Sequence, residues 1–108
     1  MNLKDEFLKQ KVNEQNVETL HILSIALISE IILNKKDFYK KKIELKKFIS
    51  HIMGKDYRDY LFDARPNLCG RIIKDIRSYR ESDLEKFYII IKNLQKSLAK
   101  TQLPEKGN

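Results

Sequence analysis

Residues 17–33 form the most apolar stretch of the sequence, and their apolar side chains would occupy almost every side of a helix. A helix that is apolar all round belongs at the centre of a bundle, where neighbouring elements cover it. The most apolar part runs from Ile22 to Leu33, which is 12 residues interrupted by Ser24, Ser29 and Glu30. A membrane-spanning helix needs about 20 predominantly apolar residues. The stretch therefore predicts a core helix rather than a membrane span.

Apolar residues recur at helical spacing along the rest of the chain, which predicts an all-α protein. Three Gly and two Pro are few for a strand-rich domain with many turns. Four main helices are expected over residues 17–33, 41–53, 66–79 and 83–99. Their short connections favour an antiparallel four-helix bundle. An extra N-terminal helical segment is expected over residues 3–15, and a short helical turn over 56–62.

Helix boundaries carry recognisable signals. Asn16 is expected to cap the start of the apolar helix, and Asn34 to end it in a left-handed conformation. Gly54 stands where the next helix should stop, and Pro66 suits a first helical turn. The segment Ser82–Glu85 has the Ser-x-x-Glu spacing of a capping box, so Ser82 is predicted to begin the last helix.

The length of 108 residues fits one domain, expected over residues 1–100, with a flexible C-terminal tail over 101–108 that contains Pro104 and Gly107. Cys69 is the only cysteine, so no internal disulfide can form, which fits a reducing cytosol. The polar first 15 residues lack the apolar region of a signal peptide. A cytoplasmic protein is expected.

Few residues suggest catalytic or metal chemistry. Cys69 lies in an apolar helical stripe, which is typical of a small core residue. His21 is expected to be partly buried and His51 exposed, and neither has a second ligand at metal-binding spacing. Gly70 within a helix suggests a close helix–helix contact. We therefore expect a protein that is not an enzyme and that has no cofactor or metal.

The positive charge is concentrated in the middle of the chain. Residues 35–80 contain fourteen Lys or Arg and six acids, a net charge of +8 in a chain of net charge +7. Such a segment predicts an anionic partner, namely nucleic acid, lipid headgroups or an acidic protein face, although a solvated surface is the alternative. The candidate contacts are Lys35, Lys36, Lys40, Lys41, Lys42, Lys46, Lys47, Arg71, Lys74, Arg77 and Arg80.

Residues 31–98 resemble the immunity proteins of class IIa bacteriocins, the pediocin-like or enterocin A type. The similar segments are Ile31–Asn34, Glu44–Lys46, Tyr60–Asp63, Pro66, Leu68, Arg71–Ile73, Tyr79 and Asn93–Leu94. The long N-terminal lead 1–15 and the short tail depart from that family.

The resemblance implies a basic cytosolic bundle that protects a producer cell from its own bacteriocin. Such a protein would bind, on the inner face of the membrane, the complex between the bacteriocin and a sugar-phosphotransferase permease. An anionic lipid surface would be a further partner. Because the C-terminal half is implicated in specificity, the resemblance points to Lys96, Lys100, Gln102 and Lys106.

Two other functions fit the same residues. A basic nucleic-acid-binding regulator could use a helix-turn-helix over Asp59–Ile76, and Tyr39, Tyr57 and Tyr79 lie beside basic residues where they could stack on bases. Half-buried tyrosines at helix edges are the alternative that we favour. A small inhibitor or adaptor encoded by a phage or plasmid, which binds one protein partner, also fits.

Overall fold

The computed structural model describes residues 2–100, and this part of the chain is helical without a β-strand. Its elements are α1 (Leu3–Lys9), the 3₁₀ helix η1 (Glu14–Asn16), α2 (Val17–Leu33), α3 (Lys42–Met53), the 3₁₀ helix η2 (Asp59–Asp63), α4 (Arg65–Ser82) and α5 (Leu84–Lys100). The predicted all-α bundle is confirmed. The expected short turn over 56–62 is η2, which begins three residues later.

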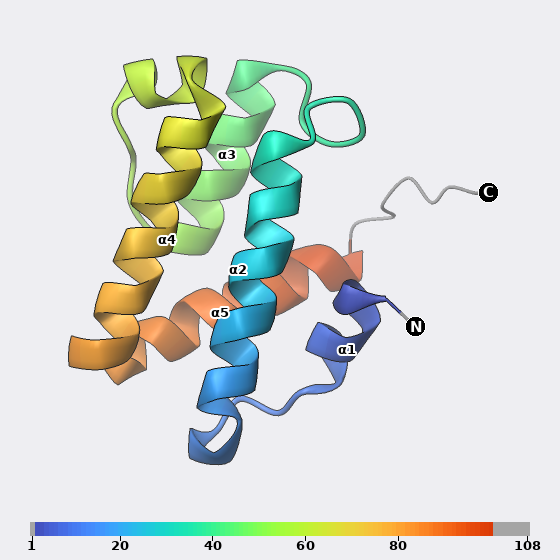
Figure 1. Cartoon of the computed structure of the whole chain (residues 1–108), viewed down its shortest axis with the longest axis vertical. Coiled ribbons are helices and arrows are strands. Elements are labelled where there is room, and N and C mark those ends of the chain that lie inside the picture. The colour runs from blue at the N-terminus through green and yellow to red at the C-terminus, as the bar shows by residue number, and fades with distance from the viewer. Residues whose placement is uncertain (1, 101–108) are drawn as a thin grey trace.

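The helices pack in two layers. In Figure 1, α2 and α4 lie side by side and run in opposite directions, while α5 crosses behind them and α1 lies beside α5. The molecule measures 18 Å along its shortest axis, which leaves room for two helices of about 10 Å diameter. The last helix thus closes the bundle crosswise and contacts each of the other four helices.

The core helix α2 packs against α1, α4 and α5. It buries Leu20, Leu27, Ile28, Ile31 and Ile32. Although the 20-residue helical stretch Glu14–Leu33 could cross a membrane by length and composition alone, it serves here as the core of a compact globule. The sequence predicts that α2 is enclosed on all sides. One side is open instead, since Ile22 is 63% exposed and Leu33 is 50% exposed.

The N-terminal segment is held mainly by the side chain of Phe7. Phe7 of α1 is fully buried, and Leu8 and Val12 pack against the core as partly buried side chains. Full burial of a phenylalanine stabilises the fold by about 1.5–3 kcal/mol. This contribution explains why α1 is docked although its apolar stripe is thin.

Two predicted boundaries are confirmed. Gly54 ends α3 in the left-handed conformation, with φ of 70°, and Pro66 lies in the first turn of α4. Asn16 and Asn34 occupy the two cap positions of α2, as predicted, but neither has the predicted capping geometry. The side chain of Asn16 makes no capping bond to α2 and donates instead to the carbonyl of Lys11 (2.8 Å). Asn34 ends the helix with φ of −90°, outside the left-handed region.

The predicted capping box is also wrong, because α4 continues through Ser82. The Ser82 hydroxyl donates back to the carbonyl of Ser78 (2.8 Å) instead of capping α5. The Asp83 carboxylate accepts the backbone N–H of Lys86 (3.2 Å), so the helix start lies one residue later. A carboxylate at a helix N-terminus gains from the helix dipole as well as from the hydrogen bond.

Side-chain amides of α5 bind carbonyls at the ends of other helices. The last four carbonyls of a helix lack partners within it. The Gln95 amide donates to the carbonyls of Phe7 and Gln10, both at 3.0 Å, and the Asn93 amide donates to that of Ile52 (3.3 Å). The crossing helix is thereby attached to the C-terminal ends of α1 and α3.

The end of α2 is bound by Arg65, the first residue of α4. Its guanidinium donates to the carbonyl of Ile32 (3.2 Å) and to that of Tyr39 (2.5 Å). Burial of the guanidinium lowers the pKa of Arg65. One side chain thus joins α2, the following loop and α4.

Replacing Arg65 tests the contribution of these two hydrogen bonds to stability. Arg65→Met keeps an unbranched side chain but leaves two carbonyls without donors, so the free energy of unfolding should fall by about 2–3 kcal/mol. Urea denaturation followed by circular dichroism measures the change. Arg58→Met, at an exposed position before η2, is the matched control and should stay within about 0.5 kcal/mol of the wild type. Equal stability of the two variants would contradict the role given to Arg65.

Gly70 makes no close helix contact, contrary to its predicted role. It is exposed on α4, and a methyl group added there would meet no atom within 4 Å beyond its chain neighbours and the backbone of its own helix. Because the site is helical and open, Gly70→Ala should raise the free energy of unfolding by about 0.5–1 kcal/mol. The same denaturation experiment measures it. A loss of stability would mean that the Gly70 backbone makes a contact that this structure lacks.

Candidate anionic-surface site

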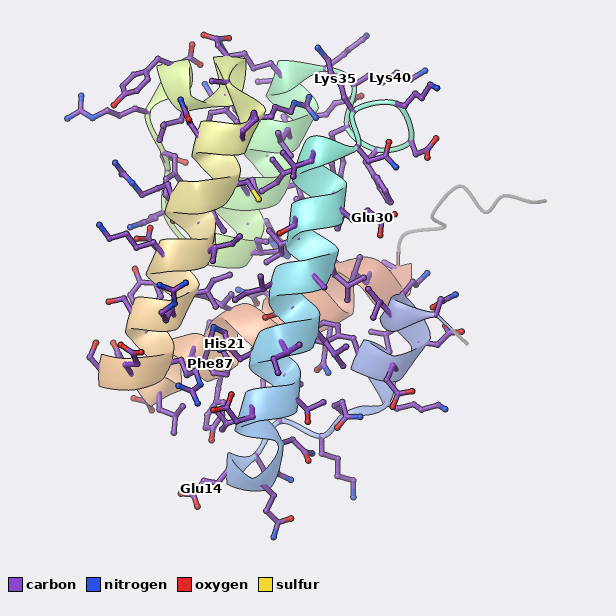
Figure 2. The ribbon with its side chains drawn as sticks, in the orientation of Figure 1. Glu14, His21, Glu30, Lys35, Lys40 and Phe87 are labelled. Atoms are coloured by element: carbon purple, nitrogen blue, oxygen red, sulfur yellow. The ribbon has the colours of Figure 1, made fainter. Side chains whose placement is uncertain are left out.

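The basic residues singled out from the sequence separate into exposed and internally paired groups. The lysine loop, defined as Lys35, Lys36, Lys40 and Lys41 between α2 and α3, is exposed. Figure 2 shows Lys35 and Lys40 at the end of the molecule where α2 stops, with their side chains directed away from the ribbon. No ion pair involves these four lysines within residues 2–100.

The loop backbone is fixed by contacts on its inner side. The Asn34 amide donates to the Asp37 carboxylate (3.0 Å), and the N–H of Phe38 donates to the carbonyl of Asn34 (3.1 Å). Tyr39 stacks on Phe48 with ring centroids 5.0 Å apart. Because Arg65 also holds the Tyr39 carbonyl, the lysines project from an anchored loop.

The sequence predicts Lys42 and Lys46 as contacts for an anionic partner, but both are paired with acids of this chain. Lys42 Nζ lies 2.7 Å from the Asp59 carboxylate and 2.8 Å from that of Asp63, and Lys46 Nζ lies 2.7 Å from Asp59. These contacts raise the pKa of Lys42 and lower that of Asp59 to about 2, chiefly through the Lys42–Asp59 hydrogen bond. The two lysines attach η2 to α3 and neutralise its acids.

Arg80 also turns inward. Its guanidinium pairs with Glu18 of α2, and its side chain is only 24% exposed. The exposed basic face of α4 therefore consists of Arg71, Lys74 and Arg77, one fewer than the sequence predicts. Lys47 is exposed on α3.

The tyrosines named as possible base-stacking groups are engaged within the fold. Tyr57 is buried and its hydroxyl donates to Asp75 (2.5 Å); burial and this hydrogen bond raise its pKa. Tyr39 stacks on Phe48, and Tyr79 packs half-buried beneath the Lys86 ammonium. The alternative of half-buried structural tyrosines is confirmed for Tyr39 and Tyr79, and Tyr57 is buried further.

A helix-turn-helix does not form. That motif joins its two helices by a turn of three or four residues. Within the predicted span Asp59–Ile76, the first element is the five-residue 3₁₀ helix η2 instead of an α-helix, and only Ala64 separates it from α4. Within α4, Leu68, Cys69 and Ile72 are buried in the core.

The structure also locates the remaining residues that the sequence singled out for specificity or chemistry. Lys96 and Lys100 are exposed on α5, whereas Gln102 and Lys106 lie outside the described residues. Cys69 is a buried core residue, as predicted, with Sγ 3.5 Å from the Ser29 hydroxyl. Within residues 2–100, no group of three or more His, Cys, Asp or Glu side chains is arranged to hold a metal ion.

Two apolar residues beside the lysine loop were not singled out from the sequence. Leu33, the last residue of α2, is 50% exposed, and Ile43, in the first turn of α3, is 55% exposed. The signal for Ile43 was present, since it lies off the helical stripe of Leu45, Phe48, Ile49, Ile52 and Met53. Leu33 carried no such signal because it continues the apolar pattern of α2.

His21 is half-buried with its ring edge toward Phe87, at a centroid distance of 6.0 Å (Figure 2), and His51 is exposed, both as predicted. His21 Nε2 is buried and has no hydrogen-bond partner. Burial, and then the Arg80 guanidinium, lower the pKa of His21 from 6.5.

This environment predicts a dependence of stability on pH. Because the unfolded chain takes up the His21 proton first, the free energy of unfolding should decrease as pH falls through 6.5. His21→Asn should remove this part of the pH dependence, whereas the exposed-site control His51→Asn should retain it. Urea denaturation between neutral and mildly acidic pH measures both slopes. A wild-type slope in His21→Asn would contradict the assignment.

A scan against protein-family models, a search of curated proteins and a search of solved structures each find no match to this chain. The likeness to class IIa immunity proteins therefore stays a prediction carried by the sequence segments quoted for it.

Proposed function

We propose that this chain is a non-enzymatic binding protein that acts at the inner face of the membrane as a bacteriocin immunity protein. The observation that carries the proposal is the anchored loop with its four exposed lysines. In the described chain, Lys42, Lys46 and Arg80 have internal acidic partners, whereas the lysine loop has none. Unpaired cations on a fixed backbone favour an external anionic partner.

The fold is compatible with this role. The resemblance implies a helical bundle, and the described chain is one. Blocking a permease–bacteriocin complex requires an exposed surface but no reacting group. The lysine loop would place the protein near the anionic inner leaflet, where the complex lies. The exposed Lys96 and Lys100 of α5 would then contribute to the choice of bacteriocin.

Nucleic-acid binding is a weaker explanation of the same charge. Sequence-tolerant binding of single strands combines basic grooves with exposed aromatic rings. The three tyrosines singled out for stacking, Tyr39, Tyr57 and Tyr79, are packed within the fold, and the exposed Tyr60 lies on η2, outside the lysine loop. Duplex recognition through a helix-turn-helix lacks its first α-helix, because η2 is a 3₁₀ helix of five residues that runs almost directly into α4.

Expression in a sensitive strain tests the proposal. Cells that produce the protein should survive at least one class IIa bacteriocin at a concentration that kills cells carrying the empty vector. An immunoblot confirms that the protein accumulates, and a pore-forming peptide that does not use the permease is the specificity control. Unchanged killing by a broad panel of class IIa bacteriocins, with the protein present, would remove the proposal.

A further inference from the structure

Two exposed apolar residues bracket the lysine loop. Leu33 precedes it and Ile43 follows it, and they are 50% and 55% exposed. A single exposed apolar side chain is ordinary on a protein surface. Here, however, two such side chains stand at the two ends of a loop that carries four unpaired lysines.

Leu33 lines one shallow hollow together with three of the loop lysines, Lys35, Lys36 and Lys40. Ile43 lies one helical turn from the exposed Lys47 on the outer side of α3. The loop itself is held by the Tyr39–Phe48 stack. Apolar and cationic groups are therefore presented together at one end of the molecule, where the loop lies in Figure 1.

We infer that this end of the molecule is a membrane-docking surface for anionic lipid, with Lys35, Lys36, Lys40 and Lys41 on the headgroups and Leu33 and Ile43 at the acyl boundary. The inference rests on the proposed function, for which it names a lipid partner. Peripheral proteins bind membranes through such a combination of buried apolar area and attraction to anionic lipids.

The apolar residues favour lipid over other anions. A phosphodiester backbone attracts lysines but offers little to Leu33 or Ile43, whereas the acyl boundary removes both from water. Two acids lie nearby, Asp37 within the loop and Glu44 beside Ile43. Asp37 is bonded to the Asn34 amide, and the four lysines outnumber the two acids.

The basic face of α4 offers an internal comparison. Arg71, Lys74 and Arg77 are exposed there, but the strongly exposed apolar residues of the described chain lie on other elements. The lysine loop and the basic face of α4 therefore differ in apolar exposure. Removing three positive charges from either surface gives two variants of equal net charge, so the α4 variant is a matched control.

The first experiment measures flotation of the protein with vesicles of phosphatidylcholine, with and without phosphatidylglycerol. Binding should require phosphatidylglycerol and weaken with salt. Each lysine near an anionic membrane contributes up to about fivefold in affinity. The variant Lys35→Gln/Lys36→Gln/Lys40→Gln should therefore lose at least about tenfold.

The control variant Arg71→Gln/Lys74→Gln/Arg77→Gln should lose at most about threefold, since charges away from the membrane are screened. An equal loss in the two triple variants would overturn the inference, because net charge alone would then explain binding. Equal binding to vesicles without phosphatidylglycerol would overturn it as well. Circular dichroism confirms that each variant folds.

The second experiment tests apolar insertion. The chain contains no Trp, so one introduced tryptophan reports its own surroundings. Ile43→Trp should shift its emission to the blue when phosphatidylglycerol vesicles are added. Ile89→Trp, at an α5 position that is 50% exposed, is the matched control and should not shift. Matching shifts, or none in Ile43→Trp, would overturn the inference.

Nucleic acid and the proposed function are separated by two further measurements. Duplex DNA that binds as tightly as the vesicles, and loses affinity in the lysine-loop variant without an Ile43→Trp shift, would assign the surface to nucleic acid and overturn the inference. Vesicle binding can be measured without a bacteriocin. If the protein binds vesicles but does not protect cells from the bacteriocins, only the proposed immunity function is removed. Protection that persists when the wild-type protein does not bind vesicles removes only the lipid inference.

Discussion

The guanidinium of Arg65 joins parts of the chain that apolar packing alone would not align. Its two donors bind the carbonyl of Ile32 in α2 and that of Tyr39 in the α2–α3 loop, while its own backbone starts α4. The last carbonyls of α2 need a donor, and the planar fork of arginine can serve two acceptors at once. Because Tyr39 also stacks on Phe48, the loop is held from both sides and its lysines point outward. The lysine loop thus depends on a part-buried contact made by the first residue of α4.

Charge in the middle of the chain is divided between structural and exposed groups. Lys42 and Lys46 bind Asp59 and Asp63, which packs η2 onto the first turns of α3. Arg80 does the same for α2 and α4 through Glu18. Such pairs contribute little individually when exposed, but they fix which cations remain unpaired. The excess charge consequently reaches solvent mainly at the lysine loop and the α4 face, and the exposed Leu33 and Ile43 flank the first of these.

The helices of this fold could be predicted from sequence because each of them repeats apolar residues at helical spacing, as α3 does from Leu45 to Met53. Local signals placed Gly54 and Pro66 correctly, since each acts within a single turn. The start of α5 could not be settled locally, because Ser82 and Asp83 both offer a capping oxygen and the carboxylate took the role. The internal pairing of Lys42, Lys46 and Arg80 could not be predicted from the sequence for another reason. Their acidic partners lie 13 to 62 residues away, so the pairing depends on how the helices pack.

The excess hydrophobicity of α2 connects the core to the candidate site. A helix with apolar residues on every side cannot bury all of them in a domain two layers thick, and Ile22 and Leu33 are left on its open side. Burying them would require a further element against α2, while a polar replacement at position 22 would remove the exposure without disturbing the core. Leu33 differs from Ile22 in its surroundings, because it lies where the helix ends and lines the hollow of Lys35, Lys36 and Lys40. The point at which the core helix stops therefore decides that an apolar side chain stands among the unpaired lysines.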